Sequence, residues 1–409
     1  MATIGLLGSY GGLNIGDEAI LTSMLATFRE SVPFAEIVLF SRDAAHTRDA
    51  HSVDRVIDAR RGRCDAVSEE IARLDVLVLG GGGLLYDGEA TEYLRHVRTA
   101  HRHGVPTVAY AIGAGPLTSA EDRRVVREVL SDMARVTVRD ENSRRILEDV
   151  GVERAIQVVA DPALLLVPAP FPADALVREG LDASGRLIAM SVREPGRAGP
   201  DLTAEEYHSL LAAVADFVVH RYGGLVVFVP MERVDVRESH AVLARMVAPD
   251  RARVLHGTYG PRELLGLMQH MDLAVGMRLH FLIFAAISGV PFLPLPYASK
   301  VSELARMLGM PMPNSLGRDA VGPLLAGIDK VWDERQEYGD RLRGRLEKLK
   351  PRSAATLQHV LDLLPEPSPR PLADGRQHPQ QKGVRHATVE PAGSGGAADP
   401  APTLSAAGS

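Results

Sequence analysis

The chain has 409 residues, 45% of them hydrophobic and 24% charged, with a formal net charge of −6. This composition is typical of a globular protein, and the acids interleaved with the arginines give no indication of a basic nucleic-acid-binding surface. A single cysteine, Cys64, excludes an intramolecular disulfide. No stretch approaches the ~18 apolar residues of a transmembrane helix, and no basic signal-peptide segment precedes the first apolar run. We therefore expect a cytoplasmic protein. The sequence does not decide whether it contacts the inner face of the membrane peripherally.

Short apolar runs alternate with longer helical patterns along the chain. Six strands are predicted in the first part, over residues 4–7, 37–40, 76–79, 107–112, 135–138 and 158–160. Four more are predicted in the second part, over residues 187–191, 225–229, 273–275 and 291–295. Helices are predicted between them, for example over residues 18–31, 120–134, 204–221 and 261–269. This alternation is typical of parallel sheets with helices on both faces.

Ten strands are too many for one compact sheet, so we divide the chain at a proline-rich segment. Residues 1–164 and 187–364 are predicted to form two Rossmann-like doubly wound domains, joined by a linker over residues 165–186. Two such domains place a ligand-binding cleft between the carboxyl ends of their strands. The tail, residues 365–409, is rich in Pro, Gly, Ala and Ser and is predicted to be disordered.

Three glycine-rich loops follow strands in the first predicted domain. They read "GSYGGLNIGDEA" (8–19), "GGGGLLYD" (80–87) and "GAGP" (113–116). Glycine permits close backbone approach to a ligand, so three such loops favour a polar ligand, although one alone is more often a tight turn. None has the G-x-G-x-x-G spacing. The first has P-loop spacing, but Asp17 and Glu18 replace the lysine and hydroxyl residue, which rules out an NTPase.

The acidic pair has two interpretations. In the first, Asp17 and Glu18 at a helix start only complement the positive end of the helix dipole. Alternatively, Asp17 faces the cleft and accepts a proton from a substrate hydroxyl.

The stretch "GMRLHFLIFAAISGVPFLPLPY" places Arg278 and His280 where a strand is followed by a helix. Cations at a helix N-terminus are disfavoured unless an anion lies among them. Either a phosphate or carboxylate binds there, or Arg278 forms a structural ion pair and His280 is a core histidine with its hydrogen bonds satisfied. Arg139 and Arg193 also follow predicted strands. Four potential cations at strand ends suit a small, dense anion.

Six stretches, in order along the chain, resemble the polysaccharide pyruvyl transferase family. They read "GSYGGLNIGDEAIL", "LVLGGGGLLYD", "VTVRDENS", "VADPALLL", "SVRE" and "VGMRLHFLIFAAISGVPFLPLPYASKV". The resemblance implies a two-domain glycosyltransferase-B-like fold, with the acceptor on the N-terminal side and the donor on the C-terminal side. It also implies phosphoenolpyruvate as donor, a sugar of a cell-surface glycan or its lipid-linked precursor as acceptor, and a pyruvate ketal as product.

The resemblance also implies roles for individual residues. Donor-binding positions match Arg193, Arg278, Leu279 and His280, and catalytic positions match Asp17, Arg139 and His280. We expect His280 to be the acid, kept protonated by the bound anions, and Asp17 to be the base, while Arg139 and Arg278 hold phosphate. The acceptor-side loops contribute Asn14, Gly16, Gly81 and Gly82. The double glycine of "SYGGLNIGDE" departs from the family pattern on this side. No metal, no cofactor beyond phosphoenolpyruvate and no nucleic-acid partner is expected, and a homo-oligomer is left open.

Two alternatives remain at this point. One is a glycosyltransferase of the same architecture that uses a nucleotide sugar, with Glu303 as the carboxylate that contacts the ribose. The other is an inactive binding or scaffold protein. The intact "GMRLH" and "GDEA" argue against the second, because an inactive copy has no need to keep cations at a helix start.

Overall fold

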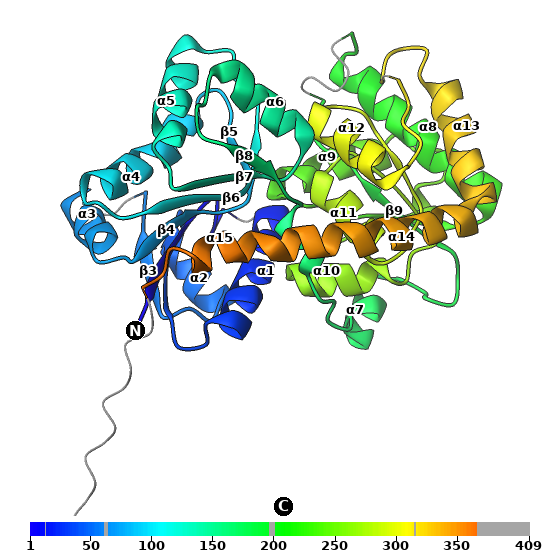
Figure 1. Cartoon of the computed structure of the whole chain (residues 1–409). Helices are drawn as coiled ribbons and strands as arrows, with labels where there is room; N and C mark the ends of the chain where they lie inside the picture. Colours follow the sequence, from blue (N-terminus) through cyan, green and yellow to red (C-terminus); the bar gives the residue numbers. More distant parts are fainter. Residues whose placement is uncertain (13, 61–63, 196–200, 315, 366–409) are drawn as a thin grey trace, which may run out of the picture. The chain divides into compact units, whose positions relative to one another are not determined.

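Two parallel β-sheets with helices on their faces make up the computed structural model (Figure 1). It describes residues 1–12, 14–60, 64–195, 201–314 and 316–365. The predicted disordered tail, apart from Pro365, lies outside the described residues.

The first sheet has eight strands in the order β3-β2-β1-β4-β6-β7-β8, with β5 paired to β6. The strands are β1 Thr3–Leu7, β2 Glu36–Ser41, β3 Arg55–Asp58, β4 Val76–Leu79, β5 Gly82–Leu85, β6 Thr107–Ala114, β7 Arg135–Val138 and β8 Ile156–Val158. All pairs are parallel. The strand order changes direction between β1 and β4, and such a switch point opens a crevice at the carboxyl ends of the strands.

The second sheet has five parallel strands in the order β11-β10-β9-β12-β13. They are β9 Leu187–Ser191, β10 Leu225–Phe228, β11 Ala252–Val254, β12 Leu273–Gly276 and β13 Phe292–Pro294. Its switch point lies between β9 and β12. We call each sheet, with the helices that cover it, the first lobe and the second lobe.

All ten predicted strands are present, with small shifts of their ends, and each lies in the sheet to which it was assigned, but three further strands were not predicted. The sheets have eight and five strands because β3, β5 and β11 were missed. The edge strands β3 ("RVID") and β11 ("ARV") are short and charged, so they lack a clear apolar run. The strand β5 begins with Gly82 and Gly83, and the run "GGGGLLYD" was therefore taken for a loop throughout.

Helices cover the sheets as the alternating pattern predicts. In the first lobe they are α1 Ile15–Ser31, α2 Ala44–Ala50, α3 Cys64–Ala72, α4 Ala90–Arg102, α5 Ala120–Ser131 and α6 Glu141–Val150. In the second they are α7 Ala173–Arg178, α8 Ala204–Tyr222, α9 Arg233–Leu243, α10 Pro261–Met268, α11 Leu279–Ile287, α12 Ser299–Leu308 and α13 Val321–Asp333. The chain continues through α14 Arg335–Ala354, the short 3-10 turn Ala355–Leu357 and α15 Gln358–Leu361. No helix in the described ranges is both long and apolar enough to cross a bilayer.

The central strands are buried on both faces, as expected for a parallel sheet with helices on either side. Along β4, Val76 and Val78 belong to one apolar cluster, whereas Leu77 and Leu79 belong to a second cluster on the opposite face. The first cluster continues through α1 into the second lobe, where it includes Phe292 of β13. One apolar core is therefore shared by both sheets.

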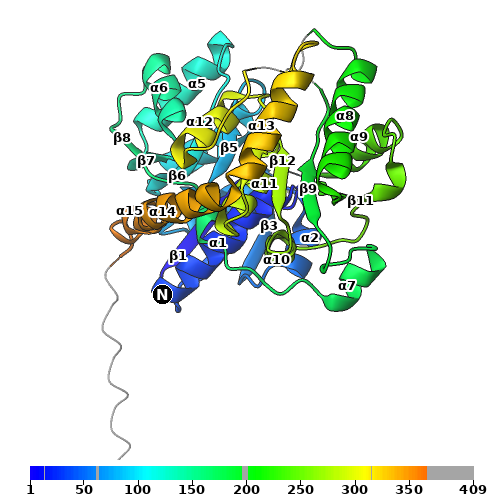
Figure 2. The same cartoon turned by 90° about the vertical axis from the view of Figure 1, so that its right-hand side faces the viewer.

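Two segments join the lobes. The predicted linker contains α7, and its Phe171 and Leu181 are buried in the shared core. The helix α14 (orange in Figures 1 and 2) packs against α11 and α12 and ends beside the 3-10 turn η1, Pro162–Leu165. There Arg352 donates to the carbonyls of Val158 and Val159, at 3.2 Å each. The last helices therefore contact the first lobe. The predicted boundary at residues 165–186 separates the strands of the two sheets, and as a boundary between domains it stays a proposal.

Candidate active site

The N-termini of α1 and α11 meet at the switch points of the two sheets. Ile15 N, in the first turn of α1, donates to the carbonyl of Met231 in the second lobe at 2.9 Å. The ring of His280, in the first turn of α11, lies directly against Gly16: a Cβ on Gly16 would be 2.0 Å from His280 Nδ1. Only glycine permits this approach, so the predicted loop residue Gly16 and the predicted acid His280 form one contact.

Asp161 joins two of the predicted catalytic residues. Its carboxylate lies 3.4 Å from the Arg139 guanidinium and 3.6 Å from His280 Nε2. The side chains of Arg139 and Asp161 are buried, and that of His280 is 12% exposed. Burial raises the pKa of Asp161, but the charges of His280 and Arg139 outweigh this and hold the pKa below its usual range. Asp161 is therefore a carboxylate that lies between the Arg139 guanidinium and the His280 ring.

His280 is not the satisfied core histidine of the alternative interpretation. Its Nε2 is buried and has no hydrogen-bond partner among the described residues. Asp161 lies just beyond hydrogen-bonding distance, at 3.6 Å. A buried polar atom without a partner is costly, and such atoms concentrate at functional sites. His280 Nε2 is therefore available to a ligand.

Asp17 lies in the first turn of α1, beneath the second glycine loop. A Cβ on Gly82, whose φ is +104°, would be 3.0 Å from Asp17 Oδ1. Burial raises the pKa of Asp17, and the opposing effects of His280, of a hydrogen bond from Ser9 and of Lys300 are smaller. A buried carboxylate with a raised pKa is suited to general-base chemistry.

The other loop residues have different surroundings. Asn14 caps α1, its side chain accepting from the backbone N–H groups of Gly16 and Asp17, and it donates to Glu232 of the second lobe. A Cβ on Gly81 would be 3.0 Å from Ile20 and 3.2 Å from a ring carbon of Pro162, so this glycine is required for packing. The predicted contact of Asn14 and Gly81 with an acceptor stays a prediction.

Arg278 forms a dense ion-pair cluster. Its guanidinium makes two hydrogen bonds to Glu232, at 2.9 and 3.0 Å, and two to Asp235, at 3.0 and 2.5 Å. Glu194 lies 3.8 Å away. The structural ion pair that we kept as an alternative is therefore present. Glu232 and Asp235, which the sequence analysis missed, sit at the start of α9, where "MERVD" follows β10.

Arg193 lies in a neighbouring group that includes two further residues missed from the sequence. Its guanidinium lies over the ring of Tyr297, 4.6 Å from the centroid, and Lys300 lies 5.6 Å from the same centroid. Burial raises the pKa of Tyr297, but the positive charges of Lys300 and Arg193 outweigh it and lower the pKa. Both residues belong to "PYASK", directly after β13, and a lysine at a helix start was the signal that could have found them.

A small cavity lies beside Arg139 and Asp161. It is lined by residues of both lobes, including Arg139 and Asp161 from the first and Leu279 and Lys300 from the second. The structure thus brings Asp17, Arg139, His280 and Leu279 together with Asp161 and Lys300. Among the described residues no cluster of acidic, histidine or cysteine side chains could hold a metal ion.

Comparison with known proteins places the chain in a family. A family model described as Polysaccharide pyruvyl transferase matches residues 14–299, a range that includes every predicted site residue. The chain belongs to this family. It is therefore a transferase with a role in polysaccharide pyruvylation. A curated relative, the amylovoran biosynthesis protein AmsJ of Erwinia amylovora, is 22% identical over 297 residues, covering 69% of this chain and 71% of that protein.

Solved structures similar to this family member show its fold. S. aureus MnaA, determined with UDP, has a TM-score of 0.60 at 10% identity, covering 89% of this chain and 98% of that one. Anabaena Alr3699/HepE, in complex with UDP and glucose, has a TM-score of 0.58 at 13% identity, covering 88% and 99%. UDP-GlcNAc 2-epimerase from Neisseria meningitidis has a TM-score of 0.57 at 11% identity, covering 88% and 100%. The predicted glycosyltransferase-B-like architecture is confirmed.

Proposed function

We propose that this pyruvyl transferase takes its pyruvyl group from phosphoenolpyruvate and attaches it, as a ketal, to two hydroxyls of a sugar. The acceptor is a cell-surface polysaccharide or its lipid-linked precursor, and the reaction takes place in the cytoplasm without a further cofactor. The observation that carries the proposal is the group formed by Asp17, Arg139, Asp161 and His280, in which an acid, a base and a buried cation converge at the switch points of both sheets.

The donor carries a phosphate and a carboxylate on three carbons, and it therefore needs several cations. Arg139 and Lys300 supply two of them at the small cavity, and Arg193 supplies a third, over the Tyr297 ring that Lys300 also approaches. Arg278 has a smaller share in this proposal than the sequence suggested. A guanidinium has five N–H donors, and four hydrogen bonds to Glu232 and Asp235 leave at most one for a ligand. Its main effect is to fix the start of α11.

His280 acts as the general acid. It gives its Nε2 proton to C3 of phosphoenolpyruvate, which becomes a methyl group and leaves a cationic centre at C2. The free Nε2 supports this role, because no protein group competes for it among the described residues. Asp161, 3.6 Å away, supplies the negative charge that compensates the proton before transfer.

Asp17 acts as the general base. It removes the proton of the first sugar hydroxyl as that oxygen attacks C2. The bond from C2 to the phosphate oxygen then breaks, and Arg139 and Lys300 stabilise the leaving phosphate. The second hydroxyl attacks C2, loses its proton and closes the ketal ring. Of the two hydroxyl protons released, one replaces the proton delivered to C3 and the other leaves with inorganic phosphate.

Donor identity is tested by thermal unfolding with phosphoenolpyruvate, UDP or GDP. We expect phosphoenolpyruvate alone to raise the Tm of the wild type, because a ligand that binds only the folded state stabilises it. Lys300→Ala should reduce this shift, whereas Lys330→Ala, at an exposed position of α13, should leave it unchanged. Stabilisation by a nucleotide diphosphate and none by phosphoenolpyruvate would support the nucleotide-sugar alternative instead. The carboxylate assigned to that alternative, Glu303, is paired with Arg306.

The acid is tested by His280→Asn. We expect phosphate release in the presence of acceptor to fall by about 10²–10⁴-fold, the range for loss of a general acid. The Tm shift with phosphoenolpyruvate should persist, because the donor cations remain. Wild-type turnover in this variant would show that another residue protonates C3.

A further inference from the structure

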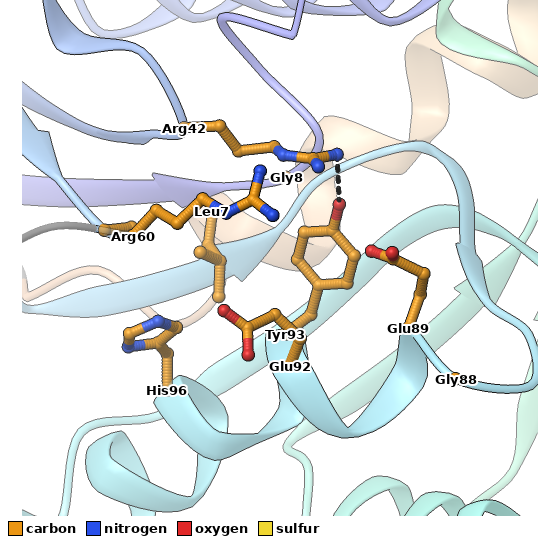
Figure 3. Close-up of a pocket in the computed structure, with 10 residues that line it drawn as sticks. Leu7, Gly8, Arg42, Arg60, Gly88, Glu89, Glu92, Tyr93 and His96 are labelled. Atoms are coloured by element: carbon orange, nitrogen blue, oxygen red, sulfur yellow. Dashed lines mark hydrogen bonds between the residues drawn. The ribbon is translucent and has the colours of Figure 1, made fainter.

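A second cavity opens at the carboxyl edge of the first sheet, where β1, β2 and β3 end beside the start of α4 (Figure 3). Its volume is about 240 Å³, and it lies entirely in the first lobe. None of its lining residues belongs to the motifs that carried the proposed catalytic roles, apart from Gly8 in the first glycine loop. The side chains that matter for its chemistry are Arg42, Arg60, Glu89, Glu92, Tyr93 and His96.

One wall carries two arginines that lack carboxylate partners in the described part of the chain. Figure 3 shows the guanidinium groups of Arg42 and Arg60 pointing toward each other and toward the ring of Tyr93. Arg42 donates to Ser9 Oγ at 3.3 Å and to the Tyr93 hydroxyl at 3.5 Å. Among the described residues, neither arginine has a carboxylate within ion-pair distance, whereas Arg278 has three. Two adjacent cations that form no direct ion pair with a described residue favour an anion between them.

The opposite wall is suited to hydroxyl groups. Glu89 and Glu92 flank Tyr93 at the start of α4 and face the arginines across the cavity (Figure 3). Burial, and then the charge of Arg95, lower the pKa of His96 to about 4, so this histidine is neutral at physiological pH. Carboxylates and a neutral imidazole accept hydrogen bonds from sugar hydroxyls, and the Tyr93 ring offers an apolar surface.

The cavity adjoins the proposed base. Ser9, which accepts the hydrogen bond of Arg42, also hydrogen-bonds toward Asp17. Tyr93 lies near enough for Asp17 to contribute to its raised pKa, after the larger effect of burial. Ser9 therefore links the arginine wall of the cavity to Asp17.

We propose that this cavity binds a sugar residue of the acceptor that carries an anionic group, either a carboxylate or a phosphate. Arg42 and Arg60 bind the anion, and Glu89 and Glu92 accept hydrogen bonds from the hydroxyls of the same residue. The inference rests on the proposed function, since it names the chemical class of the acceptor that Asp17 deprotonates.

Isothermal titration of the full chain with glucose, glucuronic acid and glucose 1-phosphate tests the proposal. At least one acidic sugar should bind roughly tenfold or more tightly than glucose, because charge-assisted hydrogen bonds are about twice as strong as neutral ones. The double variant Arg42→Gln/Arg60→Gln should lose this preference. Glutamine keeps a polar side chain of similar length, and the exposed Arg48→Gln on α2 is the matched control that should bind as the wild type does.

The two acidic sugars distinguish the source of the charge. Tighter binding of glucuronic acid indicates a uronic acid in the glycan. Tighter binding of glucose 1-phosphate indicates a phosphorylated or diphosphate-linked sugar. Equal binding of all three sugars, an unchanged preference in the double variant, or no saturable binding of either acid up to about 20 mM would overturn the proposal.

Binding of the donor, phosphoenolpyruvate, provides an independent measurement. The Tm shift with phosphoenolpyruvate should be the same in the wild type and in Arg42→Gln/Arg60→Gln, which also shows that the variant is folded. Loss of sugar preference with this shift intact assigns the cavity to the acceptor. If phosphoenolpyruvate shifts the Tm of neither the wild type nor the double variant, the proposed function is contradicted, whatever the sugar titrations show.

Discussion

At the scale of single residues, the proposed base Asp17 lies in an environment that disfavours its charged form. Burial raises its pKa, and His280 offsets only part of that effect. The folded-state pKa therefore lies above the unfolded value. Between these two values the folded protein binds more protons than the unfolded chain, so the free energy of unfolding falls as the pH rises through this window. At neutral pH the charged carboxylate lowers stability.

We therefore expect Asp17→Asn to raise the Tm at pH 7 while it abolishes turnover. Asparagine has no charge to bury, so the gain in Tm should shrink as the pH is lowered toward about 4, the ordinary value for aspartate. Thermal unfolding of both proteins across this range measures the effect. A lower Tm for the variant at pH 7 would contradict it.

Gly16 gives a second prediction at this scale. In Gly16→Ala the new Cβ would lie 2.0 Å from His280 Nδ1, so the ring must move. We expect turnover to fall by about 10²-fold, because small misplacements of a catalytic group have effects of this size. Gly12→Ala is the control, since its Cβ would meet only the Ser9 carbonyl oxygen, at 3.5 Å. Equal turnover in both variants would show that His280 does not need its observed position.

At the scale of secondary-structure elements, the starts of α1, α9 and α11 are tied together by polar contacts. Asn14 caps α1 and donates to Glu232. Glu232 and Asp235 lie at the start of α9, and both accept hydrogen bonds from Arg278 at the N-cap of α11. The side chain of Asp235 is fully buried. This cluster fixes the two helices that carry Asp17 and His280 across the boundary between the lobes.

We expect Arg278→Ala to lower the free energy of unfolding by about 3–5 kcal/mol, because it leaves buried carboxylates without their cation. Arg306→Ala removes an ion pair with Glu303 within α12 and should change the free energy of unfolding by less than about 1 kcal/mol. Urea unfolding of both variants measures the difference. Similar small effects would mean that solvent reaches the carboxylates of the Arg278 cluster.

At the scale of the whole molecule, the shared apolar core predicts that both lobes unfold together. The only tryptophan, Trp332, stacks on Tyr222 in the second lobe at a centroid distance of 4.2 Å, so its fluorescence reports that lobe. Far-UV circular dichroism reports both. We expect the two transitions to coincide, and Phe28→Ala, in the first lobe, to shift both by the same amount. Separate transitions would show that the lobes fold independently.

The sequence by itself determined most of the elements and several residues of the candidate site. Continuous apolar runs such as 76–79 predict buried parallel strands because both faces of these strands are covered. The motifs around Asp17 and around Arg278 to His280 predict a ligand site at strand ends, and the family match includes them all. These are local signals: periodicity, caps and short motifs are contained in a few neighbouring residues.

Only the tertiary structure decided which of these residues act on one another. Asp161 lies in the stretch "VADPALLL", but its place between Arg139 and His280 depends on packing across the lobes. The same holds for Arg278, whose carboxylate partners lie on α9, and for the cavity of Arg42 and Arg60. Contacts between distant segments have no local signature, because they are set by strand order and by which helix ends meet.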